Sequence, residues 1–474
     1  MRYISFIVLT ALFALSPLSA QEFGFDNDSG GSSGGNSVNV KVGGEVSATL
    51  LGYINDFSEG TDHIGFGDIF SGKLNFSAGT SFADGVINLN IQTTEPQVSV
   101  DEAYVRAYFG VLEIEGGLRK LTWGKADSFG PLDVINPLDY SELTDLSNTM
   151  NLKIARPLIH ATLRIGSFSK IEGVFVPSFQ PLRYATEEPW EPAQVKKLNE
   201  NLDNINGNLN LINQGLAMFN REKFINDQFD PDEFSTLKYA QAGARFTTTI
   251  GQADFGLQYY YGRLTRPAFS VTTIIAPPMP PYIPEPRIIP TEIHYAYNPY
   301  HQVGIDWAQA ILGFNIRAEA AANITQDLSG EDPAIYNPAL LWSFGFDRDL
   351  FLGLNLNIQC NESIRLMYDK IGNKTFVDGA FTTTIIDTET DTDKISTQII
   401  AALSRKFFRD QLELRFAAIW EIEAKDYLLM PSIILTKDTV SVEFSGGIFG
   451  GDEEGQFGQY RSNKFVKVSL TYSF

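Results

Sequence analysis

The sequence predicts an all-β fold, a transmembrane antiparallel outer-membrane β-barrel of about 18 strands, with 16 as the alternative. Three observations predict it. Apolar and polar residues alternate with a period of two along many short segments, which gives each strand one apolar face. Short connections alternate with long ones, as expected of a barrel with turns at one end and loops at the other. The chain also ends on an alternating segment whose last residue is an aromatic, Phe474.

The C-terminal segment shows the alternation most clearly. Val466, Val468, Leu470, Tyr472 and Phe474 alternate with Lys467, Ser469, Thr471 and Ser473. A sheet that is apolar on its outer face must close in lipid, because unpaired strand edges do not survive there. Tyr472 and Phe474 therefore form a candidate insertion signal, of the kind that the outer-membrane barrel assembly machinery reads.

The other end of the chain predicts export. Residues 1–20 have the charged start, apolar core and small-residue end of a secretory signal peptide. Residues 21–36 follow as a flexible periplasmic leader, because 26–36 is rich in Gly and Ser and has little to bury. Residues 37–474 form the predicted barrel, and no later stretch is apolar and long enough to be a membrane-spanning helix.

Composition narrows the class of protein only in part. Cys360 is the single cysteine, so no internal disulfide can form. The formal net charge of −21 excludes nucleic acid as a probable partner. A soluble secreted enzyme would have a similar composition, so the period-two alternation decides in favour of the barrel.

The predicted strands follow from this alternation. In one of them, Leu312, Phe314 and Ile316 oppose Asn315, Arg317 and Glu319. The predicted strands lie at about 38–56, 73–78, 87–92, 102–109, 112–115, 159–165, 168–177, 238–250, 252–263, 301–309, 311–322, 340–346, 352–368, 395–405, 411–421, 427–436, 438–449 and 464–474.

Two long connections have patterns of their own. In the insertion 178–236, apolar residues spaced three and four apart from Val195 to Phe219 predict an amphipathic helix that breaks at Gly207. This helix belongs to an extracellular or pore-folded insertion. The Pro-rich segment 276–290 predicts a stiff, extended connection. The acidic run 387–393 lacks the Gly and final Glu of an EF-hand, so a solvated loop is expected there rather than a cation site.

The polar strand faces predict a lumen wall in which acidic and basic residues are nearly balanced. Opposing rows of charge would select polar solutes, whereas pairing between neighbours would only keep the lumen wet. A barrel of this size is wide enough for an aqueous channel. The candidate lumen-lining residues are Arg106, Glu113, Glu115, Arg164, Arg245, Arg317, Glu319, Arg365, Glu413 and Arg415.

The loop after residue 119 holds the most specific motif. It contains W-G-K-x-D followed by D-x-x-N-P-x-D, and the candidate constriction residues are Trp123, Lys125, Asp127, Asp133, Asn136 and Asp139. Lys125 could pair with any of the three acids if the loop folds into the pore. The alternative is a loop that is fixed to the barrel wall and has only a stabilising role.

This motif resembles that of a porin-like family of Gram-negative outer-membrane barrels that is largely uncharacterised. The resemblance implies transport across the outer membrane. A passive channel for small hydrophilic solutes is the leading interpretation. The alternatives are a substrate-specific transporter, including one for hydrophobic substrates, and a surface adhesin that acts through its loops.

Catalytic chemistry leaves no recognisable pattern. The four His residues show no metalloprotease spacing, no G-x-S-x-G motif is present, and one Cys cannot build a zinc site. We therefore expect that the protein is not an enzyme, and that it has no catalytic residue, no metal and no cofactor. The expected partners are outer-membrane lipid, the assembly machinery and small-molecule solutes. An apolar belt is required by lipid, so it is not evidence for an oligomer.

Overall fold

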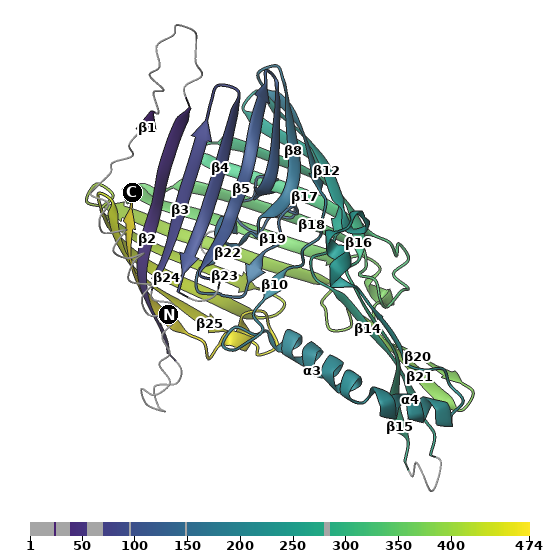
Figure 1. Ribbon diagram of the computed structural model, residues 1–474. Helices are drawn as coiled ribbons and strands as arrows, with labels where there is room; N and C mark the ends of the chain where they lie inside the picture. Colours follow the sequence, from purple (N-terminus) through teal and green to yellow (C-terminus); the bar gives the residue numbers. More distant parts are fainter. Residues whose placement is uncertain (1–22, 25–37, 55–69, 94–95, 147–148, 279–284) are drawn as a thin grey trace, which may run out of the picture.

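The computed structural model describes residues 23–24, 38–54, 70–93, 96–146, 149–278 and 285–474. The predicted signal peptide and most of the predicted leader lie outside these residues. The main body of the described chain is an antiparallel sheet closed into a ring (Figure 1). No helix in this part of the chain is both long and apolar enough to cross a bilayer.

The ring is a closed barrel of 18 antiparallel strands, as the sequence predicted. It closes where the last strand pairs with the first, with Val46 opposite Tyr472 and Leu50 opposite Val468. A two-residue strand, β1 (Phe23–Gly24), adds to the start of β2 outside this ring. The ring strands are β2 (Asn39–Tyr53), β3 (Phe70–Gly79), β4 (Ala83–Gln92), β5 (Val98–Phe109), β6 (Leu112–Arg119), β8 (Arg156–Ile165), β9 (Ser169–Val176), β12 (Gln241–Ile250), β13 (Ala253–Arg263), β16 (Pro299–Ile311), β17 (Phe314–Thr325), β18 (Ala339–Asp349), β19 (Leu354–Arg365), β22 (Ile395–Phe407), β23 (Leu412–Glu421), β24 (Asp426–Lys437), β25 (Val440–Gly450) and β26 (Phe465–Ser473).

The seam between β2 and β26 shows how the alternation separates the two faces. Leu50 and Leu470 are about half exposed, at 54% and 50%, and they point outward. On the opposite face, the Thr49 hydroxyl lies 2.9 Å from the Ser469 hydroxyl. Large exposed apolar side chains recur in this way on strands all round the ring. A continuous apolar belt of this kind is stable only against lipid.

The connections differ between the two ends of the ring. Short turns join β3 to β4, β5 to β6, β8 to β9 and β12 to β13, all at one end. The long connections 120–155, 177–240, 264–298 and 366–394 lie at the other end, which we call the long-loop end. Two connections at the long-loop end, β4–β5 and β23–β24, are also short.

Three of the long connections build a second sheet, which with its helix α4 we call the arm. Its strand order is β11 (Ile225–Gln228), β15 (Arg287–Ala296), β14 (Ala268–Ala276), β21 (Phe381–Ile386) and β20 (Lys374–Asp378). Helix α4 (Leu209–Met218) packs on this sheet through Leu216, which contacts the apolar cluster around Ile274 and Ile289. Figure 1 shows the arm projecting away from the ring.

The two helices of the insertion, α3 and α4, therefore lie outside the ring and not in the pore. Helix α3 (Ala193–Gly207) ends where α4 follows after one residue, so the predicted break at Gly207 is confirmed. No side chain of α3 is buried, unlike Leu216 of α4. The remaining short elements are β7 (Asp139–Tyr140), α2 (Thr149–Leu152), β10 (Arg183–Tyr184), η3 (Pro231–Ser235), η4 (Leu237–Tyr239), η5 (Phe351–Gly353), η6 (Tyr368–Lys370) and η7 (Gly458–Tyr460).

The ends of the Pro-rich segment 276–290 are extended, as its composition predicted, and they belong to the hairpin of β14 and β15. The central part of the predicted stiff connection, residues 279–284, lies outside the described residues. Pro290 lies within β15, opposite Thr273, where the register of the hairpin shifts. Because proline has no N–H to donate, it is tolerated in a sheet at such an irregularity.

Candidate functional site

The connection 120–155 between β6 and β8, here called the lumen loop, crosses the interior of the ring. It leaves and rejoins neighbouring strands, yet it hydrogen-bonds to Glu319 on β17 and to Gln359 on β19. Passing round the ring from β6, the neighbours are β8, β9, β12, β13, β16, β17, β18 and β19, so β19 belongs to the far wall. A segment that joins β6 and touches the far wall must pass through the lumen.

Glu319 is the first anchor of the loop. Its side chain is buried, and its carboxylate accepts hydrogen bonds from the backbone N–H groups of Lys125, Ala126 and Leu132. A Cβ atom at Gly124 or Gly130 would collide with this carboxylate. Gly124 also has a φ of +96°, which disfavours other residues. Gly124 of the motif and Gly130 just after it therefore let the backbone approach a carboxylate on the wall.

Gln359 is the second anchor. Its side-chain oxygen accepts from the N–H groups of Asp127 at 3.0 Å and Ser128 at 3.1 Å. The Asp127 carboxylate in turn accepts from Arg317 and, at 2.8 Å, from Asn357. The turn at 125–128 is thus fixed to β17 and β19 by both its backbone and its one acidic side chain.

Apolar packing holds the loop against the wall of β9, β12, β13 and β16. Trp123 is only 3% exposed and lies in a cluster with Ile135, Val174 and Tyr260. Its indole lies so close to Gly243 that a Cβ atom there would collide with the ring. Glycine at this position of β12 leaves the space that the tryptophan fills.

The returning half of the loop is held by buried polar groups. The Asn136 side-chain oxygen accepts from the Leu121 N–H at 2.8 Å, and its amide donates to the carbonyls of Arg119 and Ile154. Lys153 is buried and lies 2.6 Å from the Asp133 carboxylate. These bonds tie the two ends of the loop together at the wall where it begins.

Lys125 does not pair with the acids of its own loop, as the sequence had suggested it could. Its nearest carboxylate belongs to Asp254 on β13, with 3.6 Å between nitrogen and oxygen. Asp133 is occupied by Lys153, and Asp139 pairs with Arg183 at 2.6 Å. The pairing changes because the loop spreads across the lumen, which separates residues that are close in sequence.

Most of the predicted lumen-lining residues make ion pairs with their neighbours on the wall; Glu319, which binds backbone N–H groups, and Arg365, which pairs with Glu389, do not. Arg106 lies 2.6 Å from Glu115, Arg164 lies 3.1 Å from Glu113, and Arg415 lies 2.8 Å from Glu413. Arg245 forms a buried pair with Asp306, which the sequence had not singled out, at 2.6 Å. Arg317 also binds Asp347 at 2.6 Å. The arrangement therefore corresponds to the neighbour-pairing interpretation of the charged wall.

The acidic run 387–393 is solvated only in part: Asp391 and Asp393 are exposed, whereas Glu389 is buried. Glu389 is 2% exposed, and its carboxylate lies 3.0 Å from Arg365 Nε and accepts from the Asn337 N–H at 2.7 Å. The alternation cannot show this, because Glu389 lies outside the strands and its partner is on β19. Within the described chain, no three His, Cys, Asp or Glu side chains are placed to hold a metal ion.

A second obstruction in the lumen was not predicted. Trp190, in the connection after β10, is 3% exposed and donates its indole N–H to the Tyr53 hydroxyl at 3.2 Å. Its ring centroid lies 5.3 Å from that of Phe449 and 6.4 Å from that of Phe465. Phe465 shares the inner face of β26 with Ser469, so this aromatic cluster fills part of the lumen. Tryptophan in a long loop is the only sequence signal for it.

Comparisons with known proteins give structural likeness only. No protein-family model matches the chain, and no curated protein matches it either. Among solved structures, OccK9 (OpdG) of Pseudomonas aeruginosa has 8% identity and a TM-score of 0.46, covering 92% of this chain and 97% of its own. OmpF of Salmonella typhi, in complex with daunomycin, has 8% identity and a TM-score of 0.41, with coverages of 93% and 98%. A BenF-like porin from Pseudomonas fluorescens Pf-5 has 6% identity and a TM-score of 0.46, with coverages of 92% and 98%.

Proposed function

We propose that this chain is an outer-membrane channel for passive diffusion of small hydrophilic solutes, and that the lumen loop sets its narrowest point. The observation that carries the proposal is the path of this loop, which crosses a closed ring and is anchored on Glu319 and Gln359 at the far wall. The exposed apolar belt supports lipid as the surroundings. The paired charges of the wall suit a wet lumen and disfavour the alternative of a hydrophobic-substrate transporter.

Exposure divides the motif residues into two roles within this proposal. The side chains of Lys125, Asp127 and Asp139 are about a quarter to a third exposed, at 29%, 32% and 25%. These three are the residues we assign to contact with passing solutes. Trp123 and Asn136 are nearly buried, and with Asp133 they hold the loop in place.

The C-terminal residues Tyr472 and Phe474 concern how the barrel reaches the membrane. Tyr472 is 41% exposed on the outer face, and its ring stacks on that of Phe474 with 6.2 Å between centroids. The Phe474 backbone also exchanges hydrogen bonds with Gly44 of β2. We propose that this terminal pair is the signal that the barrel assembly machinery recognises, after export directed by residues 1–20.

Single-channel conductance of the refolded protein in a planar lipid bilayer tests the proposed channel. Stable open steps on the nanosiemens scale are expected. Replacing residues 122–139 with a short Gly-Ser linker should raise the conductance of each step, because the crossing segment is removed. A protein that is folded, as shown by its heat-modifiable mobility on a gel, but conducts nothing would overturn the proposal.

A surface-binding role is the second candidate, and the arm is the observation that favours it. Two helices and a five-stranded sheet outside the ring are not needed for diffusion. Deleting the hairpin of β20 and β21 should leave conductance unchanged under either role. Loss of binding to host or matrix ligands in that variant, with conductance intact, would support the adhesin.

A further inference from the structure

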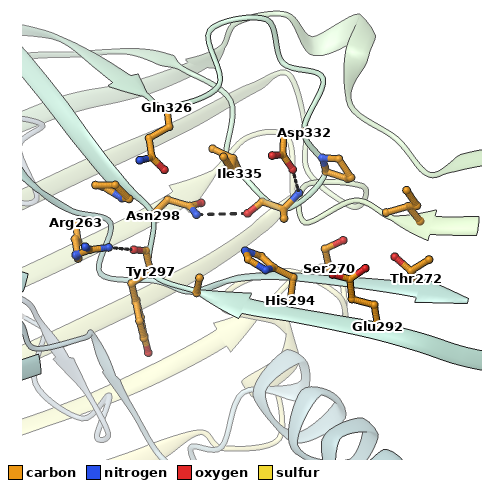
Figure 2. Close-up of a pocket in the computed structure, with 15 residues that line it drawn as sticks. Arg263, Ser270, Thr272, Glu292, His294, Tyr297, Asn298, Gln326, Asp332 and Ile335 are labelled. Carbon is orange, nitrogen blue, oxygen red and sulfur yellow. Dashed lines mark hydrogen bonds between the residues drawn. The ribbon is translucent and has the colours of Figure 1, made fainter. Parts of the chain in front are cut away.

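A cavity of about 610 Å³ lies where the arm meets the ring. Its floor is the arm hairpin, with Ser270 and Thr272 on β14 and Glu292 and His294 on β15. The connection 326–338 forms the opposite side, and Figure 2 shows Asp332 there, facing the hairpin. The volume falls within the range of small-molecule sites in proteins.

Several donors that line the cavity are already used by the protein. The Arg263 guanidinium donates to the carbonyls of Tyr297 at 2.7 Å and Lys238 at 3.3 Å. The Asn298 amide donates to the Ala334 carbonyl, and the Ser270 hydroxyl donates to the Ile386 carbonyl at 2.8 Å. Among the described residues that line the cavity, Arg263 is the only Lys or Arg, and its side chain is committed to holding the backbone around it.

The groups left free are mostly acceptors. Within the described chain, the Glu292 carboxylate has no ion pair and no hydrogen bond, and the Thr272 hydroxyl and the Gln326 amide are also unbonded. His294 Nδ1 lies 2.7 Å from the Asp227 carboxylate on β11. In a neutral imidazole, that contact places the proton on Nδ1, so Nε2 carries a lone pair. The Glu292 carboxylate, joined by His294 Nε2 in the neutral imidazole, makes a site that accepts hydrogen bonds.

We propose that this cavity binds a small organic cation with a primary ammonium group, and that Glu292 supplies the opposite charge. An ammonium has three donors and no acceptor, so it complements a carboxylate, an imidazole nitrogen and a hydroxyl. An anion would meet an unpaired carboxylate and find no free cation. The inference goes beyond the proposed channel, because binding here needs no conduction.

Isothermal titration calorimetry on the refolded full chain in detergent tests the proposal, with diaminobutane, butanediol and succinate as probes of equal chain length. Diaminobutane should bind, and the other two should not. Glu292→Gln, which keeps the shape and removes the charge, should weaken diaminobutane binding by about tenfold or more. Thr272→Val should weaken it by a smaller factor.

The matched control is Glu222→Gln, which neutralises an exposed carboxylate after α4 that does not line the cavity. This variant should bind diaminobutane like the parent protein. Heat-modifiable mobility on a gel verifies that each variant is folded. Succinate or butanediol binding as tightly as diaminobutane, no binding of diaminobutane by the parent, or equal binding by Glu292→Gln would each overturn the proposal. A protein that binds diaminobutane but does not conduct would refute only the channel.

Discussion

At the residue scale, the carboxylate of Glu319 joins three backbone N–H groups of the lumen loop to β17. Hydrogen bonds to a charged acceptor are stronger than neutral ones, and a buried donor without a partner is costly. In Glu319→Gln, one side-chain oxygen is replaced by an NH₂ group that cannot accept from a backbone N–H. The loop should therefore lose part of its attachment to the far wall while the ring stays intact.

We expect Glu319→Gln to raise single-channel conductance and to increase current fluctuations in the open state, as recorded in planar bilayers. Glu443→Gln is the control, because it removes a carboxylate from β25 that makes no hydrogen bond to the described part of the lumen loop. Open-state current and noise identical to those of the parent in Glu319→Gln would show that this anchor does not position the loop.

Gly124 of the motif leads to a second prediction at this scale. A Cβ atom at Gly124 would collide with the Glu319 carboxylate, and the φ of +96° adds backbone strain. Gly124→Ala should lower the free energy of unfolding by about 2 kcal/mol or more, measured by urea denaturation of the refolded protein. Gly116→Ala is a matched control, since a Cβ atom there has no neighbour within 4 Å. A similar loss for both variants would contradict the prediction.

These residues show how far sequence reasoning reaches at this scale. The W-G-K-x-D motif drew attention to the loop that contacts the far wall, and alternation placed Glu319 among the residues expected to face the lumen. Neither pattern shows that Glu319 binds the loop, because Lys125 is 194 residues away and the contact depends on closure of the ring. For the same reason, the partner of Lys125 was not the one expected.

At the element scale, the two obstructions in the lumen are held by different means. The lumen loop combines hydrogen bonds to Glu319 and Gln359 on the far wall with packing of Trp123 on the near wall. The segment around Trp190 combines packing against the rings of Phe449, Tyr460 and Phe465 with the hydrogen bond from Trp190 to Tyr53. Removing a buried indole leaves a cavity and costs about 3–5 kcal/mol in typical cores. The segment 185–192 should then separate from the wall more easily than the lumen loop.

We expect Trp190→Ala to increase conductance and to make residues 185–192 more sensitive to added protease in proteoliposomes. Trp420→Ala is the control, because Trp420 is 53% exposed and lies on the outer face of β23. That variant should leave the conductance unchanged. An increase in Trp420→Ala as large as in Trp190→Ala would indicate a general loosening of the barrel and contradict the assignment.

At this scale too, some elements could be predicted from the sequence and others could not. Ring strands were found because every strand repeats the same two-residue period, and the helix break was found because Gly207 interrupts a regular stripe. The hairpins of the arm were missed, because β14, β15, β20 and β21 pair with one another across connections that each read as a loop. Pro290 within β15 hides this strand further, because proline is uncommon inside a sheet.

At the scale of the whole molecule, the distribution of charge determines what the channel should prefer. The formal net charge is −21, yet many wall charges pair with a neighbour of opposite sign, as Arg106 does with Glu115 and Arg245 with Asp306. Much of the excess negative charge therefore belongs to acidic residues outside these pairs. Glu292 at the long-loop end is one such acidic residue, since it has no cationic partner in the described chain. A negative field at the mouth raises the local concentration of cations.

A weak preference for cations that disappears at high salt is therefore expected. In a KCl gradient, the reversal potential should have the sign of K⁺ selectivity near 0.1 M, where the Debye length is about 10 Å. It should approach zero near 1 M, where that length falls to about 3 Å, because the acids that produce the field lie at the mouth and are screened. A preference that persists at 1 M would place the selecting charge in the constriction, on Asp127 or Asp139. A preference for Cl⁻ would contradict the mouth-field explanation altogether and assign selectivity to Lys125 and the arginines of the wall.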